Sequence, residues 1–144
     1  MKLLVSRTLP DSVMEAAAEY FDVTCRDTTV PMSLDECRAA LAEADVVLPT
    51  LADAFTADAF TGEIRAKGLA NFGVGYNHID VAAARAAGLV VTNTPGAVTD
   101  ATADTAMTLI LMTARRAGEG ERLVRAGGWQ GWHPTQMLGM HVTG

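Results

Sequence analysis

Short apolar runs alternate with longer amphipathic segments over the first 95 residues of the chain. The apolar runs are rich in valine and leucine, which is typical of strands buried on both faces of a sheet. We expect strands at residues 2–6, 22–26, 46–48, 69–72 and 89–92. The segments between them predict helices at about 11–20, at 33–44, just after Thr56 and at 81–87. Strands that alternate with helices at this spacing predict an α/β fold, with a parallel sheet and helices on both faces.

Residues that start and stop helices support these boundaries. Ser33 and Glu36 form a capping-box pattern, in which each side chain bonds the backbone amide of the other residue. Asp80 is placed to cap the helix at 81–87, and Gly88 is placed to end it. These residues are therefore expected to have structural roles.

A longer helix is expected at 101–125, after a capping residue at Thr99 or Asp100. At 1.5 Å per residue, such a helix would be roughly 37 Å long. Because it is apolar nearly all round at 106–111, we expect burial on more than one side, by a second domain or a second subunit. The alternative is a helix that packs one face on the sheet.

The chain is less regular beyond the middle of this helix. Gly118 and Gly120 weaken the last third of the helix and offer a place for a kink. The tail at 127–144 is rich in glycine, carries Trp129 and Trp132, and is expected to be irregular. Exposed tryptophans in such a tail could anchor a contact, and packing on the parent domain is an equal alternative.

The charge and the cysteines limit the kind of protein. The net charge is −6, which argues against a nucleic-acid partner, because such proteins normally have a basic face. It also argues against binding to an anionic membrane surface, and the longest apolar run is too short to span a bilayer. Cys25 and Cys37 have no metal-ligand spacing and are expected to be free thiols, so we expect a cytoplasmic protein.

Candidate chemistry centres on Gly73, Val74 and Gly75, which follow a predicted strand and precede a helix. Successive backbone amides in such a turn can converge on one anion, here a small carboxylate. The alternative is a plain tight turn. A dinucleotide fingerprint is disfavoured, because His78 stands where its third glycine should fall. The loop at 49–53 follows another strand, so it could face the glycine turn across one edge of the sheet.

Other polar residues are poorer candidates. His78, His133 and His141 have no partner at metal-ligand spacing, so no metal site is predicted, and His78 is expected to be a solvated turn residue. Asp53 and Asp58 are expected to lie on the surface. Asp104 is most simply explained by its place in the first turn of the long helix.

Three stretches of the sequence together resemble the D-isomer-specific 2-hydroxyacid dehydrogenases, in their glyoxylate and hydroxypyruvate reductase branch. The stretches are 71–81, 86–96 and 101–104, the last opening the long helix. The resemblance implies a flavodoxin-like substrate-binding domain at 1–95. It also implies that 96–144 opens a nucleotide-binding domain, with the 101–125 helix forming an interdomain and homodimer contact.

The resemblance also implies roles for single residues. The backbone amides of Val74 and Gly75 would hold the carboxylate of a small 2-oxo acid, and Leu51 and Ala52 would line the same pocket. Thr102 would lie near the nicotinamide nucleotide, NAD or NADP. Trp132, or Trp129 as the other option, would enter the active site of the partner subunit.

The resemblance places the nucleotide loop, the arginine and the acid–histidine pair of the family later in the chain than Gly144. No catalytic residue is therefore expected here. We expect the front portion of a longer enzyme, inactive by itself. The rival interpretation is a stand-alone flavodoxin-like binding or dimerisation module without catalysis. A phosphoreceiver is disfavoured, because Ser6 and Arg7 stand where acidic residues are needed.

Overall fold

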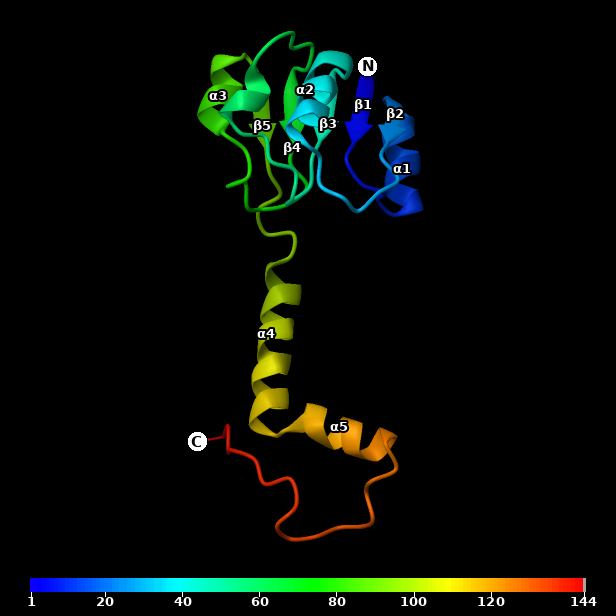
Figure 1. Cartoon of the computed structure of the whole chain (residues 1–144), viewed down its shortest axis with the longest axis vertical. Helices are drawn as coiled ribbons and strands as arrows, with labels where there is room; N and C mark the ends of the chain where they lie inside the picture. The colour runs from blue at the N-terminus through cyan, green and yellow to red at the C-terminus, as the bar shows by residue number, and fades with distance from the viewer. Residues whose placement is uncertain (144) are drawn as a thin grey trace. The chain divides into compact units, whose positions relative to one another are not determined.

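The computed structural model describes residues 1–143 and separates into two compact units, with the division after Ala97. The first unit holds a five-stranded sheet in which the strands follow the order β2-β1-β3-β4-β5 (Figure 1). All neighbouring strands are parallel. The strands are β1 Lys2–Val5, β2 Asp22–Cys25, β3 Val46–Leu48, β4 Gly68–Ala70 and β5 Val90–Thr92. This is the flavodoxin-like strand order, so the predicted fold class is confirmed.

The helices of the first unit begin and end close to the predicted positions. They are α1 Asp11–Ala18, α2 Leu34–Glu43, the 3₁₀ helix η1 Ala57–Phe60 and α3 Val81–Ala86. Both reciprocal bonds between Ser33 and Glu36 are present at the start of α2. The side chain of Asp80 accepts a hydrogen bond from the amide of Ala83, at 2.9 Å. Gly88 has a φ of 84°, the left-handed conformation in which glycine ends helices.

Two hydrophobic clusters cover the two faces of the sheet. Leu3 and Val5 join the cluster that packs under α1, whereas Val47 and Leu69 belong to the cluster under α2, η1 and α3. Neighbouring residues of a strand point to opposite faces, so one short apolar strand can supply both clusters. The expectation of helices on both faces is therefore confirmed.

The second unit contains two helices where one was expected. They are α4 Thr99–Ala114 and α5 Ala117–Arg125. Arg116 has a φ of 55°, so the helical path breaks there, and Gly118 and Gly120 lie inside α5. The expected caps are also wrong, because α4 begins after Val98 with no side-chain cap bond.

The tail explains where α4 ends. The amide of Met140 donates a hydrogen bond to the carbonyl oxygen of Ala114, at 2.8 Å. The guanidinium of Arg116 bonds Glu119 and also the carbonyl of Leu138, at 3.4 Å. Gly139 passes so close to α4 that a Cβ there would overlap the carbonyl oxygen of Ala114. These contacts compete with continuation of the helix, and none of them could be read from local helix propensity.

Large apolar side chains stand exposed along α4. Within residues 98–143 only Ala114 is buried. The exposed large apolar residues of α4 are Met107, Leu109, Ile110, Leu111 and Met112. Across residues 1–143, no helix has the length and apolar character needed to cross a membrane.

Candidate functional site

The loops that follow β1, β3, β4 and β5 lie at the carboxyl edge of the sheet, because parallel strands end on the same side. This edge is where open α/β sheets bind ligands. The loop after β3 and the turn after β4 run side by side there. Thr50 forms an isolated parallel bridge with Phe72, and the amide of Phe72 donates to the carbonyl of Pro49 at 3.0 Å. The two segments that the sequence pointed to are therefore neighbours.

The carbonyl groups of the glycine turn are all engaged. The Gly73 oxygen accepts from the Thr94 amide at 3.1 Å, and the Val74 oxygen accepts from the Asn93 side chain at 2.8 Å. The Asn71 side-chain amide donates to the oxygens of Gly73 and Gly75, at 2.9 Å each. In contrast, the amides of Val74 and Gly75 donate no hydrogen bond within residues 1–143.

Asn71 is itself held by His78. The residue is only 2% exposed, and its Oδ1 lies 2.9 Å from His78 Nε2. Since both protons of the Asn71 amide go to carbonyl oxygens, Oδ1 must accept, and Nε2 of His78 must carry a proton. Burial lowers the pKa of His78, with an opposing effect from Asp53. The expectation that His78 is a solvated turn residue is therefore wrong: it is half-buried and bonded.

Leu51 and Ala52 occupy the exposed tip of the neighbouring loop. The Leu51 side chain lies over the glycine turn, and its Cδ2 would stand 2.9 Å from a Cβ placed at Gly73. A glycine at this position therefore allows the two loops to approach closely. The loop at 49–53 thus faces the glycine turn, as expected, whereas the role of Leu51 toward a ligand stays a prediction.

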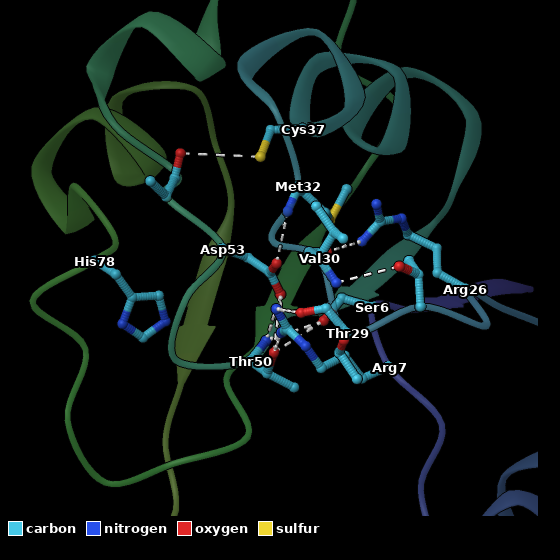
Figure 2. A network of polar contacts seen from close by, with 12 residues as sticks. Ser6, Arg7, Arg26, Thr29, Val30, Met32, Cys37, Thr50, Asp53 and His78 are labelled. Atoms are coloured by element: carbon cyan, nitrogen blue, oxygen red, sulfur yellow. Dashed lines mark hydrogen bonds and ion pairs between the residues drawn. The ribbon is translucent and has the colours of Figure 1, made fainter.

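Beneath that tip lies a buried polar network, drawn in Figure 2. Asp53 is completely buried, and its Oδ2 accepts from the Thr50 amide at 2.8 Å and from the Thr50 hydroxyl at 3.1 Å. Its Oδ1 accepts from the Met32 amide at 3.0 Å, and Arg7 Nη1 lies 3.4 Å from Oδ2. The prediction that Asp53 is a surface residue is therefore wrong. Its partners Arg7 and Met32 come from distant parts of the chain, so local sequence could not reveal them.

The environment keeps Asp53 ionised. Burial alone would raise the pKa of its carboxyl group. Hydrogen bonds from the hydroxyls of Ser6 and Thr50 and from the amides of Met32 and Thr50 outweigh burial, and hold the pKa below its ordinary value. Asp53 is thus a fixed negative charge that closes the loop after β3 and leaves Leu51 at its tip.

The other predicted site residues lie in the second unit. Thr102 is exposed in the first turn of α4. Trp129 and Trp132 line a hollow of about 350 Å³ beside α5, and Trp132 is 81% exposed. Their roles toward a ligand stay predictions.

Thiol and metal chemistry find no support at this edge. Cys25 and Cys37 are both free, as predicted. Burial raises the pKa of Cys37 to about 11, so its thiol stays protonated. Among residues 1–143, no group of three histidine, cysteine, aspartate or glutamate side chains could hold a metal ion. What the edge offers is a pair of unused backbone amides beside an apolar loop tip, which suits a small anion.

Two residues that matter for this site were not singled out from the sequence. Asn71 directly follows β4, two residues before Gly73, and Asn93 directly follows β5. Asparagine side chains commonly bond the backbone two residues on, so an asparagine at such a strand end is a recognisable turn signal.

Comparison with known proteins assigns the chain to a family. A family profile described as "D-isomer specific 2-hydroxyacid dehydrogenase, catalytic domain" matches residues 3–136. The chain therefore belongs to the D-isomer-specific 2-hydroxyacid dehydrogenases. A glyoxylate reductase from Thermococcus onnurineus is 35% identical over 147 residues, which cover 99% of this chain and 44% of that protein.

Solved structures agree with this assignment. The TT0316 protein from Thermus thermophilus superposes with a TM-score of 0.86 at 35% identity, covering 97% of this chain and 45% of that one. An NADPH-dependent glyoxylate/hydroxypyruvate reductase from Sinorhizobium meliloti, in complex with NADP and malonate, has a TM-score of 0.72 at 30% identity. That match covers 92% of this chain and 41% of the reductase. The chain spans less than half the length of the curated relatives it matches.

Proposed function

We propose that this chain is the substrate-binding portion of an oxidoreductase that reduces a small 2-oxo acid to a D-2-hydroxy acid with NADH or NADPH. Substrates of the glyoxylate or hydroxypyruvate kind are inferred from the named relatives. The observation that carries the proposal is the glycine turn, where the amides of Val74 and Gly75 have no partner within residues 1–143. Arg7 is engaged with Asp53, so backbone amides are the donors we assign to the substrate carboxylate.

Leu51 and Ala52 complete the proposed pocket. Their exposed loop tip lies beside the turn, where Leu51 covers Gly73. An apolar side chain at this point would pack against the short carbon chain of the acid while the amides hold its carboxylate. Such a site favours small acids over long or branched ones.

The residues of this chain do not fit a dinucleotide. His78 stands where the third glycine of a phosphate-binding fingerprint would fall, and its ring is hydrogen-bonded to Asn71. We therefore assign NAD or NADP mainly to residues outside this chain, with Thr102 of α4 as a proposed contact. We propose that the chain alone is inactive. An assay of NADH and NADPH oxidation in the presence of glyoxylate tests this and should show no turnover.

The second unit supports a homodimer. The exposed apolar residues of α4 would be stabilised by burial against another surface. We propose that this surface is the helix pair α4 and α5 of a second copy of the chain. Trp132 or Trp129 would then reach the substrate site of the partner. Sedimentation of the chain is expected to show a dimer that Ile110→Asp dissociates. Val90→Asp, on the exposed edge of the sheet, is the matched control and should stay dimeric. A monomeric parent chain would contradict the proposal.

Titration with oxalate, a small two-carbon acid, tests the substrate site. We expect the NMR signals of the Val74 and Gly75 amides to shift in proportion to occupancy. Gly75→Val keeps the backbone amide but places a branched side chain beside it, which should hinder the approach of the carboxylate and weaken binding by about tenfold or more. The fold should tolerate this change, because a Cβ at Gly75 meets only Asn77 Oδ1, at 3.6 Å. Val90→Thr, on the exposed edge strand β5, is the control and should bind oxalate like the parent.

The outcome of this titration also separates the two candidate functions. Dimerisation without any oxalate response would favour a stand-alone dimerisation module, an interpretation that the exposed face of α4 supports by itself. The free cysteines suit a reducing compartment, so a cytoplasmic location is part of either proposal.

A further inference from the structure

We propose that Asn71, locked by His78, and Asn93 are positioning residues that aim the Val74 and Gly75 amides at the substrate carboxylate. This inference rests on the proposed function, because it explains how the same turn becomes ready to bind. It concerns side chains that would not touch the ligand.

The argument starts from the geometry of the peptide unit. In a trans peptide the carbonyl of one residue and the amide of the next lie in one plane and point in opposite directions. The Gly73 carbonyl shares its peptide with the Val74 amide, and the Val74 carbonyl shares its peptide with the Gly75 amide. Fixing these two carbonyls therefore fixes the directions of the two proposed donors.

Side chains of asparagine hold both carbonyls. Asn71 donates to the Gly73 oxygen at 2.9 Å and, together with the Thr94 amide at 3.1 Å, sets the direction of the Val74 amide. Asn93 donates to the Val74 oxygen at 2.8 Å, which sets the Gly75 amide. A turn that already has its donors oriented binds an anion without spending free energy on ordering them.

The two asparagines are not equivalent. Asn71 is 2% exposed and bonds two carbonyls, whereas Asn93 is exposed and bonds one. Water can replace the exposed bond of Asn93 more readily than the part-buried bonds of Asn71. Asn71 should therefore have the larger effect on binding.

His78 decides which way the Asn71 side chain faces. An asparagine amide can be rotated by half a turn, which would exchange its donors and its acceptor. A proton on Nε2 of His78 pairs with Oδ1 and keeps the NH₂ group on the turn. The structure thus requires His78 to hold the Nε2-protonated form when the ring is neutral.

Oxalate titration of the whole chain, followed by NMR at the Val74 and Gly75 amides, tests this inference. Asn71→Asp keeps the size of the side chain and its bond to His78 but removes both donors. It should weaken oxalate binding by at least about tenfold. Asn93→Ala should weaken it by only about twofold to threefold, because water replaces the exposed bond. Long-range proton–nitrogen spectra should show the His78 proton on Nε2.

A second pair of variants covers the case in which Asn71→Asp does not fold. His78→Gln keeps a donor in the place of Nε2 and should bind oxalate like the parent, whereas His78→Leu should bind about as weakly as Asn71→Asp. A merely structural role would lower stability in these variants and leave the oxalate affinity of the folded chain unchanged, and that result would overturn the inference.

The outcomes separate the two proposals. If the parent binds oxalate at the turn and folded Asn71→Asp binds it equally well, the inference fails and the proposed function stands. A proton found on Nδ1 of His78 alone would also overturn the inference. If the parent shows no response at Val74 and Gly75, the proposed function fails and the inference fails with it.

Discussion

The two units of the chain contrast in how they use apolar residues. The first unit buries leucine, valine and phenylalanine in two clusters, one on each face of its sheet. The second unit has the apolar helix α4, yet within residues 98–143 only Ala114 is buried. An apolar sequence alone therefore does not make a hydrophobic core, because a second apolar surface must pack against it. In the first unit the helices pack on the sheet and supply that surface, whereas within residues 98–143 no such surface buries α4.

The largest expected consequence is a difference in local stability. In dilute solution, where copies of the chain are apart, amides in β1 and β3 should exchange only through global unfolding. Those in α4 should exchange about a thousandfold faster or more, because little burial opposes local opening. Hydrogen exchange followed by NMR measures this ratio. Equal protection in the two units would show that the second unit is covered in the monomer.

Within the first unit, the strongest single effect is expected at Asp53. Asp53→Asn removes a buried negative charge and turns an NH₂ group toward donors from Thr50 and Met32. We expect the free energy of unfolding to fall by about 3 kcal/mol, as when a buried ion pair loses one member. Denaturant titration of the chain measures this value.

Asp58→Asn is the matched control for Asp53→Asn. Asp58 is exposed in η1, and its side chain makes no hydrogen bond within residues 1–143. The same chemical change should therefore alter stability by less than about 0.5 kcal/mol. Comparable losses in the two variants would contradict the role given to burial.

Acid should weaken the first unit through lowered carboxyl pKa values. Bonds from Arg65 and from the Lys2 amide lower the pKa of Asp45 from 3.8 to about 2, and the pKa of Asp53 is also lowered. A carboxylate with a lowered pKa contributes its full stability above the unfolded value and loses it as pH falls through the folded value. The denaturation midpoint should therefore drop below about pH 4.

Asp53→Asn checks this pH dependence, because it removes one of the carboxyl groups of the first unit whose pKa is lowered. The acid-induced drop in the midpoint should become smaller in that variant than in the parent. A drop of unchanged size would assign the effect to other carboxylates.

The smallest predicted effect lies in α5. Gly118→Ala adds a Cβ that meets only Arg122 Nη1, at 3.5 Å. Gly118 lies in the first turn of α5, so its replacement should stabilise the helix locally by up to about 0.5 kcal/mol, measured by hydrogen exchange of its amides. The unfolding midpoint of the first unit should not change. A shift there would show that the two units unfold together.

Much of the first unit could be predicted from sequence, because its determinants are local. The cap at Ser33, the cap at Asp80 and the glycine that ends α3 depend on residues within four positions of one another. The alternation of short apolar runs with helical segments was enough to predict a parallel sheet. The glycine turn and the Leu51 loop were also found, since both directly follow strands.

The failures share a different cause. Asp53 was misplaced because its guanidinium partner, Arg7, lies 46 residues away. The sequence offered a kink at Gly118 and Gly120, but the helix breaks at Arg116, where contacts from Leu138 and Met140 compete with its continuation. His78 was misjudged because Asn71 becomes its partner only once the turn has formed. In each case the deciding interaction links segments that the fold brings together.

The bond from Met140 to Ala114 has a consequence for proteolysis. The end of α4 is closed by a segment about 25 residues downstream, as the Arg115–Met140 contact also shows. A single protease cut within 127–137 would release that segment and loosen the last turn of a helix that the enzyme never touched. A bulkier side chain at Gly139 would do the same without any cut. Cleavage or substitution in the glycine-rich tail should thus first destabilise the last turn of α4.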